Sequence, residues 1–87
     1  MDSRSSRSID QIAGIYPNPT TGNIMLILDG EHDVEYQVQS LDGIPLINGV
    51  TEGQSAQIEM EHLENGVYLI QLISSNELLE TKKIIKL

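Results

Sequence analysis

Turn signals divide this chain into short apolar segments, and their spacing constrains the fold more than any other feature. Asp29-Gly30, Asp42-Gly43 and Asn65-Gly66 are pairs that tolerate the positive φ of tight connections. No window between them has the apolar spacing of an amphipathic helix. Short segments separated by regular turn signals are typical of all-β sandwiches and barrels. We predict seven strands, over residues 12–16, 23–28, 34–40, 45–50, 56–60, 66–74 and 78–87.

Alternation indicates which strand faces are buried. Segments 34–40 and 56–60 alternate apolar with polar residues, which predicts one buried face and one wet face. Residues 24–28 are all apolar, so this strand carries apolar side chains on both faces. Its outer face, with Met25 and Ile27, is either covered by another segment or available for self-association. The short connections favour antiparallel neighbours, and the predicted fold class is an all-β sandwich of about seven mostly antiparallel strands.

Composition excludes several classes of function. The chain has 87 residues, enough for one domain, and no cysteine, so disulfides and thiolate metal sites are excluded. Its net charge of -8 repels phosphate backbones, which argues against nucleic-acid binding. No apolar run reaches the roughly 20 residues of a membrane helix. Residues 1–11 contain no apolar signal-peptide core and are expected to be a flexible linker or a cloning remnant. If the chain is exported, its export signal lies elsewhere, or the chain is a fragment of something longer.

No pattern of catalytic or metal-binding residues is present in the sequence. His32 and His62 do not have a zinc-site spacing, and there is neither a G-x-S-x-G elbow nor a glycine-rich phosphate loop. The acidic stretch at 29–33 lacks the spacing of an EF-hand, so we interpret it as a polar hairpin rather than a calcium loop. We therefore expect no enzyme activity, no cofactor and no metal.

Positive charge gathers at the end of the chain. Lys82, Lys83 and Lys86 are its only lysines. They are either solvated residues that discourage pairing at a strand edge, or part of a recognition feature on an otherwise acidic body.

Four motifs, in order, suggest a family. They are Tyr16-Pro17-Asn18-Pro19-Thr20-Thr21-Gly22, then Ser40-Leu41-Asp42-Gly43, then Leu63-Glu64-Asn65-Gly66-Val67-Tyr68, and finally Lys82-Lys83-Ile84-Ile85-Lys86-Leu87. This series resembles the type A C-terminal sorting domain of the type IX (Por) secretion system of Bacteroidota, over about residues 12–87. One departure is Ile44, which follows Gly43 where the family usually has arginine.

The resemblance implies a fold and a role. It implies an Ig-like seven-stranded sandwich that directs a fused upstream cargo through the outer-membrane type IX translocon, from the periplasm to the cell surface or medium. It also implies that a sortase-like peptidase can remove the domain and join the cargo to an anionic lipopolysaccharide. Cleavage is then expected before Ile12. The alternative from another class is an Ig-like binding or spacer module. A carbohydrate-binding module would show exposed aromatics, whereas the three tyrosines here lie in strand patterns that fit burial.

The terminal motif is the predicted recognition element. We expect Lys82, Lys83, Ile84, Ile85, Lys86 and Leu87 to form an edge strand, with unpaired backbone groups and accessible lysines, that the translocon reads. The other motif residues are expected to be structural: Tyr16, Pro17, Asn18, Pro19, Gly22, Gly43, Leu63, Gly66 and Tyr68. Tyr16 is expected to pack on the sandwich edge, and Gly22 to permit the turn into the second strand.

Overall fold

The computed structural model describes residues 12–30, 33–74 and 77–87, so the predicted linker at 1–11 and His32 lie outside the described residues. Within these ranges the chain has seven strands and no helix, which confirms the predicted all-β class. It therefore contains no helix that could cross a membrane in the part described. The strands are β1 (Ile12–Tyr16), β2 (Ile24–Leu28), β3 (Glu35–Ser40), β4 (Pro45–Val50), β5 (Ser55–Ile58), β6 (Gly66–Ser74) and β7 (Glu77–Lys86).

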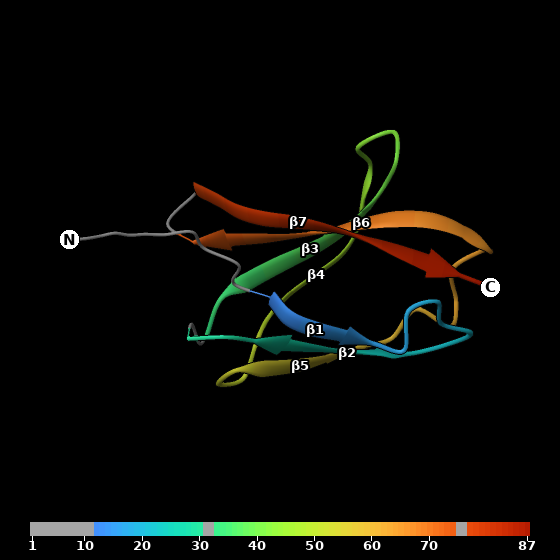
Figure 1. Cartoon of the computed structure of the whole chain (residues 1–87). Coiled ribbons are helices and arrows are strands. Elements are labelled where there is room, and N and C mark those ends of the chain that lie inside the picture. Colours follow the sequence, from blue (N-terminus) through green and yellow to red (C-terminus); the bar gives the residue numbers. More distant parts are fainter. Residues whose placement is uncertain (1–11, 31–32, 75–76) are drawn as a thin grey trace.

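The strands form two sheets that pack as a sandwich (Figure 1). One sheet has the order β1-β2-β5, and the other has the order β4-β3-β6-β7. Every paired set of strands is antiparallel. Ile12 of β1 and Asn18 in the loop that follows it each donate a hydrogen bond to β7. The edge strand of the larger sheet therefore lies beside the edge strand of the smaller one.

The core lies between the sheets and follows the predicted alternation. Ile24, Leu26 and Leu28 point inward from β2 and are at most 3% exposed, whereas Met25 on the opposite face is 37% exposed. Each buried aliphatic side chain of this kind stabilises the fold by about 1.5–3 kcal/mol. Apolar residues that are at most 1% exposed also come from β3, β5, β6, β7 and the turn after β5: Val38, Ile58, Met60, Ile70, Leu72 and Ile84.

Tyr68 ties the connection before β6 to the sandwich. Its hydroxyl donates a 2.6 Å hydrogen bond to the backbone carbonyl of Glu64, four residues upstream. The same arrangement, a tyrosine corner, occurs in immunoglobulin-type sandwiches. Leu63 packs against the core from the same connection. The leucine and the tyrosine of the L-x-x-G-x-Y pattern thus hold the connection before β6 against the sandwich.

The β3–β4 hairpin turns at Gly43 and projects beyond the sandwich (Figure 1). Gly43 has φ = 88°, a left-handed conformation that glycine adopts without steric cost. Its N–H donates to the carbonyl of Ser40 at 2.9 Å, which closes the turn. Leu41 and Ile44 flank the tip and are 61% and 57% exposed. The side chain of Ile44 therefore stands in solvent.

Tyrosine burial was predicted correctly for one of the three rings. Tyr68 is buried and Tyr36 is half-buried against the core, but Tyr16 is 57% exposed. The strand pattern that fits burial was misleading for Tyr16, whereas the expected position at the sandwich edge agrees with the structure, because Tyr16 lies at the end of edge strand β1. Its ring folds back along the strand and occupies the space beside Gly14 where a Cβ would stand.

Candidate recognition strand and its supporting loop

The predicted recognition strand, β7, lies at one edge of the four-stranded sheet. It pairs with β6 from Glu77 to Lys86, with one bulge after Leu72 of β6. Its end lies beside the loop that joins β1 to β2 (Figure 1). Edge position was predicted from the sequence and is confirmed.

All four sequence motifs meet at this end of the sheet. Ser40 of β3 pairs with Tyr68 of β6, and Tyr68 pairs with Ile84 of β7. On the outer side of β7, Thr20 forms an isolated parallel bridge with Lys86. One residue from each motif therefore falls in or next to a single row across the sheet. The four motifs, scattered over the sequence, support one structural unit around the terminal strand.

Side chains of β7 alternate between the core and solvent near its end. Ile84 is fully buried and Lys86 is 6% exposed, whereas Ile85 and Leu87 are 36% and 58% exposed. This confirms that the Ile84-Ile85 pair presents apolar side chains to both faces. It also corrects the expectation that all three lysines are accessible. Lys86 shares the inward face with Ile84 because residues two apart in a strand lie on the same side.

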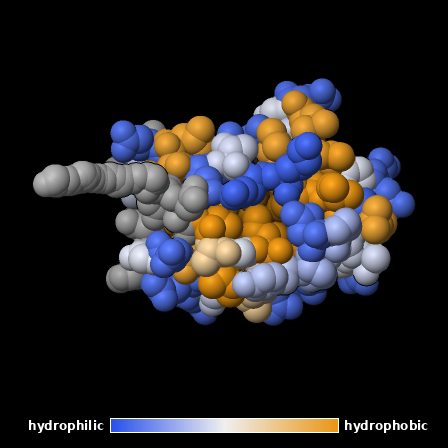
Figure 2. All heavy atoms as spheres, in the orientation of Figure 1, coloured by the Kyte–Doolittle hydropathy of each residue, from blue (hydrophilic) through white to orange (hydrophobic). Residues whose placement is uncertain are grey.

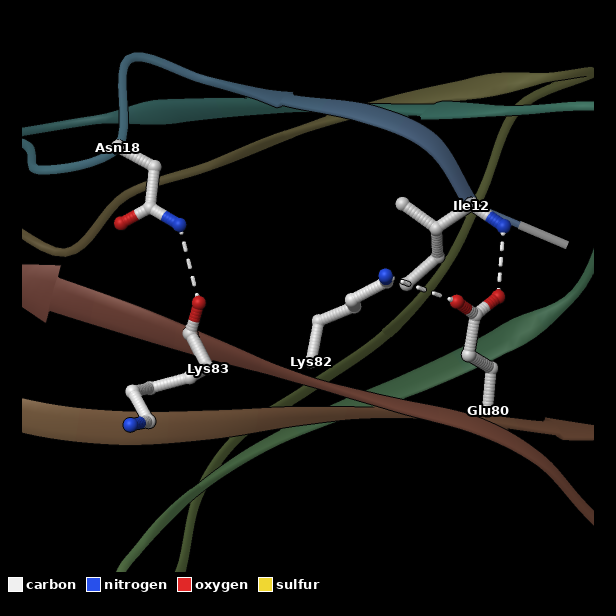
Figure 3. Close-up of polar contacts among 5 residues, drawn as sticks. All are labelled: Ile12, Asn18, Glu80, Lys82 and Lys83. Carbon is white, nitrogen blue, oxygen red and sulfur yellow. Dashed lines mark hydrogen bonds and ion pairs between the residues drawn. The ribbon is translucent and has the colours of Figure 1, made fainter. Parts of the chain in front are cut away.

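The backbone edge of β7 is not open at its end, contrary to expectation. The Asn18 side chain donates through Nδ2 to the carbonyl of Lys83 at 2.9 Å (Figure 3). Its Oδ1 accepts the N–H of Ile85 at 3.0 Å. Thr20 continues the pairing: its N–H donates to the carbonyl of Ile85 at 2.8 Å, and its carbonyl accepts the N–H of Leu87 at 2.7 Å. The loop thus pairs with β7 as a short neighbouring strand would. We call these four hydrogen bonds the edge clasp.

Thr20 also shapes the loop that carries the edge clasp. It is 1% exposed, and its hydroxyl accepts the N–H of Gly22 and donates to the carbonyl of Asn23, both at 3.0 Å. Gly22 has no positive φ, so the expectation that it permits the turn through glycine's special freedom was wrong. The hydroxyl of Thr20 closes this turn instead. The peptide bonds before Pro17 and Pro19 are both cis.

A second link joins β7 to β1. A carboxylate oxygen of Glu80, whose side chain is 11% exposed, accepts the N–H of Ile12 at 2.8 Å. Its other oxygen lies 3.5 Å from the ammonium of Lys82 (Figure 3). A shallow groove of about 200 Å³ runs between β1 and β7, and we call this junction of the two sheets the seam. Figure 2 shows apolar atoms exposed between the two layers on this side of the molecule. Lys82 therefore lies over the seam, with its charge balanced by Glu80.

Sequence reasoning missed three residues of this unit. The sequence patterns predict no role for Thr20, predict a structural role for Asn18 without its contact with the terminal strand, and do not distinguish Glu80 from the other acidic residues. A local signal existed for Thr20, because hydroxyl side chains often close turns. Asn18 and Glu80 bond to residues 65 or more positions away, which a local pattern does not reveal.

No cluster of histidine, aspartate or glutamate that could hold a metal ion occurs among the residues described. His62 is exposed in the turn closed by the hydrogen bond from Leu63 N–H to the Met60 carbonyl.

Comparison with known families agrees with the arrangement of motifs. The model of the secretion system C-terminal sorting domain family matches residues 14–87. The chain belongs to this family, which carries the sorting signal of type IX secretion. Sorting domains of this kind mark a protein for export toward the cell surface or the extracellular space. No curated protein matches the chain.

Proposed function

We propose that this domain directs a folded cargo, fused upstream, through the outer-membrane type IX translocon. The observation that carries the proposal is the family match over residues 14–87, which spans β2 to β7 entirely and most of β1. The cargo passes through the periplasm and reaches the surface or the medium. The domain acts as an address and performs no catalysis itself.

The terminal residues Lys82, Lys83, Ile84, Ile85, Lys86 and Leu87 form the segment on which recognition by the translocon depends. Its support is the position of β7: an edge strand, held at the point where all four motifs meet. Within the segment the roles divide. Ile84 and Lys86 are buried and keep the strand in place, and Lys82 pairs with Glu80 beside β1 and does not contact the partner. Lys83, Ile85 and Leu87 face solvent on the other side of the strand.

Removal of the domain completes the proposed pathway. A sortase-like peptidase cleaves the chain before Ile12 and joins the cargo to an anionic lipopolysaccharide. A cut within β1 would remove the Ile12 N–H that Glu80 holds, so a cut before it leaves the folded domain intact. Mass spectrometry of the released cargo identifies the bond, and cleavage inside a strand would contradict this placement.

Transplantation tests the proposed function. A secreted reporter is fused upstream of the full 87-residue chain, behind an ordinary export signal, in a host with a type IX system and in a strain without the translocon. We expect the reporter at the surface or in the medium of the first strain and in the periplasm of the second. Periplasmic retention in both strains would favour the alternative, an Ig-like binding or spacer module.

Deletion of residues 82–87 is a less useful test of the same function. It removes Ile84 from the core together with the exposed side chains. Loss of a buried residue of this size costs about 2–5 kcal/mol, which is a large part of the stability of a small domain. A deletion therefore changes folding and recognition at once.

A further inference from the structure

The structure limits how a partner can read the terminal strand. Ile84 is 0% exposed and Lys86 is 6% exposed, so a partner cannot contact either without opening the sandwich. Lys82 lies over the seam, where Glu80 neutralises its charge. Half of the predicted recognition segment is thus committed to contacts within the domain.

Strand addition at the end of β7 is also obstructed. A partner strand would pair with the outward backbone groups of Lys83, Ile85 and Leu87, and the edge clasp occupies these positions. The clasp must be displaced before a partner strand can bind there. The folded domain therefore presents this end of β7 through its side chains.

The outward side chains form a continuous surface with those of β6. Lys83 pairs with Leu69 and Ile85 pairs with Val67, so the four side chains share the outer face of the sheet. We call Val67, Leu69, Lys83, Ile85 and Leu87 the terminal face. Val67 and Leu69 are half-buried, and the other three are exposed.

Charge distinguishes the terminal face from the rest of the surface. The chain has 13 acidic residues and a net charge of -8, so an acidic partner group is repelled over most of the domain. Among the residues described, Lys83 is the exposed cation with no ion pair, since Lys82 has Glu80 and Lys86 is buried. In Figure 3 its side chain points away from Asn18 and from β1.

We propose that the partner recognises the terminal face in the folded domain, through Lys83 and the apolar side chains around it. The complementary surface is a protein surface that places a carboxylate within an apolar rim. This inference rests on the proposed function, since the partner is a component of the outer-membrane secretion machinery. The specificity of recognition then resides in the outer face of β7 and of its neighbour β6.

Two adjacent lysines provide a matched test in the full-chain reporter fusion. Lys83→Gln removes the charge of the terminal face, and Lys82→Gln removes the same charge one residue away over the seam. Lys82→Gln loses one partly exposed ion pair, and such pairs contribute little to stability. We expect Lys83→Gln to lower the secreted fraction about tenfold and Lys82→Gln to lower it less than about twofold. Lys83→Arg, which keeps the charge, restores secretion.

Two further variants separate recognition from folding and from strand addition. Ile85→Ser removes exposed apolar surface from the terminal face and should also reduce secretion, while urea midpoints of the purified chains stay close to the native value. Asn18→Ala opens the edge clasp, and secretion should not rise. Three results would overturn the inference. They are an equal fall in the secreted fraction of both lysine variants, an unchanged secreted fraction in Lys83→Gln and Ile85→Ser, and a higher secreted fraction in Asn18→Ala. A native fusion that is not secreted overturns the proposed function instead.

Discussion

Asn18 provides the sharpest test of the edge clasp, because its amide both donates and accepts. Asn18→Ala removes two hydrogen bonds to β7, at 2.9 and 3.0 Å. A typical hydrogen bond contributes about 0.5–1.5 kcal/mol net, and Asn18 is exposed, so the lower half of that range applies. We expect a loss of about 1–2 kcal/mol in the free energy of unfolding. For a domain of this size each kcal/mol corresponds to a fall in Tm of about 4–8 °C.

Asn18→Asp separates the edge clasp from a simple turn preference. An aspartate keeps an acceptor for the N–H of Ile85, but its second oxygen faces the carbonyl of Lys83 where the amide nitrogen stood. Two acceptors at about 3 Å repel each other, so we expect Asn18→Asp to be no more stable than Asn18→Ala. Turns accept asparagine and aspartate about equally. If Asn18 only favoured the turn, the Asn18→Asp variant would have the same free energy of unfolding as the native chain.

The assay is urea unfolding at neutral pH, followed by circular dichroism. Asn48→Asp is the matched control, because exposed Asn48 uses its Oδ1 only to accept the 3.0 Å hydrogen bond from Gln37. An aspartate preserves that bond, so the control should stay within about 0.5 kcal/mol of the native chain. An Asn18→Asp chain as stable as the native one would refute the proposed pairing of Asn18 with β7.

Two other substitutions test the turns around the same sheet. Tyr68→Phe removes the hydroxyl that donates to the Glu64 carbonyl, and we expect urea unfolding to show a loss of about 1–2 kcal/mol in the free energy of unfolding. An unchanged urea midpoint would mean that the tyrosine corner contributes nothing to stability. Gly43→Ala places a Cβ on a residue with φ = 88° and should lower Tm by an amount equivalent to about 1 kcal/mol. Gly22→Ala should change Tm little, because Gly22 has no positive φ and a Cβ there would meet open space. Equal effects of the two substitutions on Tm would contradict the difference in backbone conformation.

The seven strands could be predicted because their signals are local. Alternation in β3 placed Val38 in the core, and Asp42-Gly43 marked the β3–β4 turn. The burial of Lys86 was also contained in the sequence, since it lies two residues from Ile84. The adjacent Ile84 and Ile85 left the inward face ambiguous, and the structure shows that Ile84 takes it.

The edge clasp could not be predicted, for a physical reason. Asn18 and Lys83 are 65 positions apart, and their contact depends on how the two sheets stack and where β1 ends relative to β7. Periodicity carries no information on that stacking. A side chain that imitates a neighbouring strand also has no composition signal, since an asparagine between two prolines indicates only a turn. The family resemblance identified the motif as important but did not identify its contact.

The structure also indicates why a sorting signal benefits from being part of a sandwich. In an unfolded chain Lys83 and Ile85 are neighbours of Lys82, Ile84 and Lys86, and no face distinguishes them. Pairing with β6 sorts these residues to opposite sides, and the edge clasp keeps the end of β7 from pairing elsewhere. A partner that reads the terminal face therefore reads the fold as well as the sequence. Substitutions in the core or in the clasp should then reduce secretion in proportion to the folded fraction, whereas those in the terminal face should reduce it at constant stability.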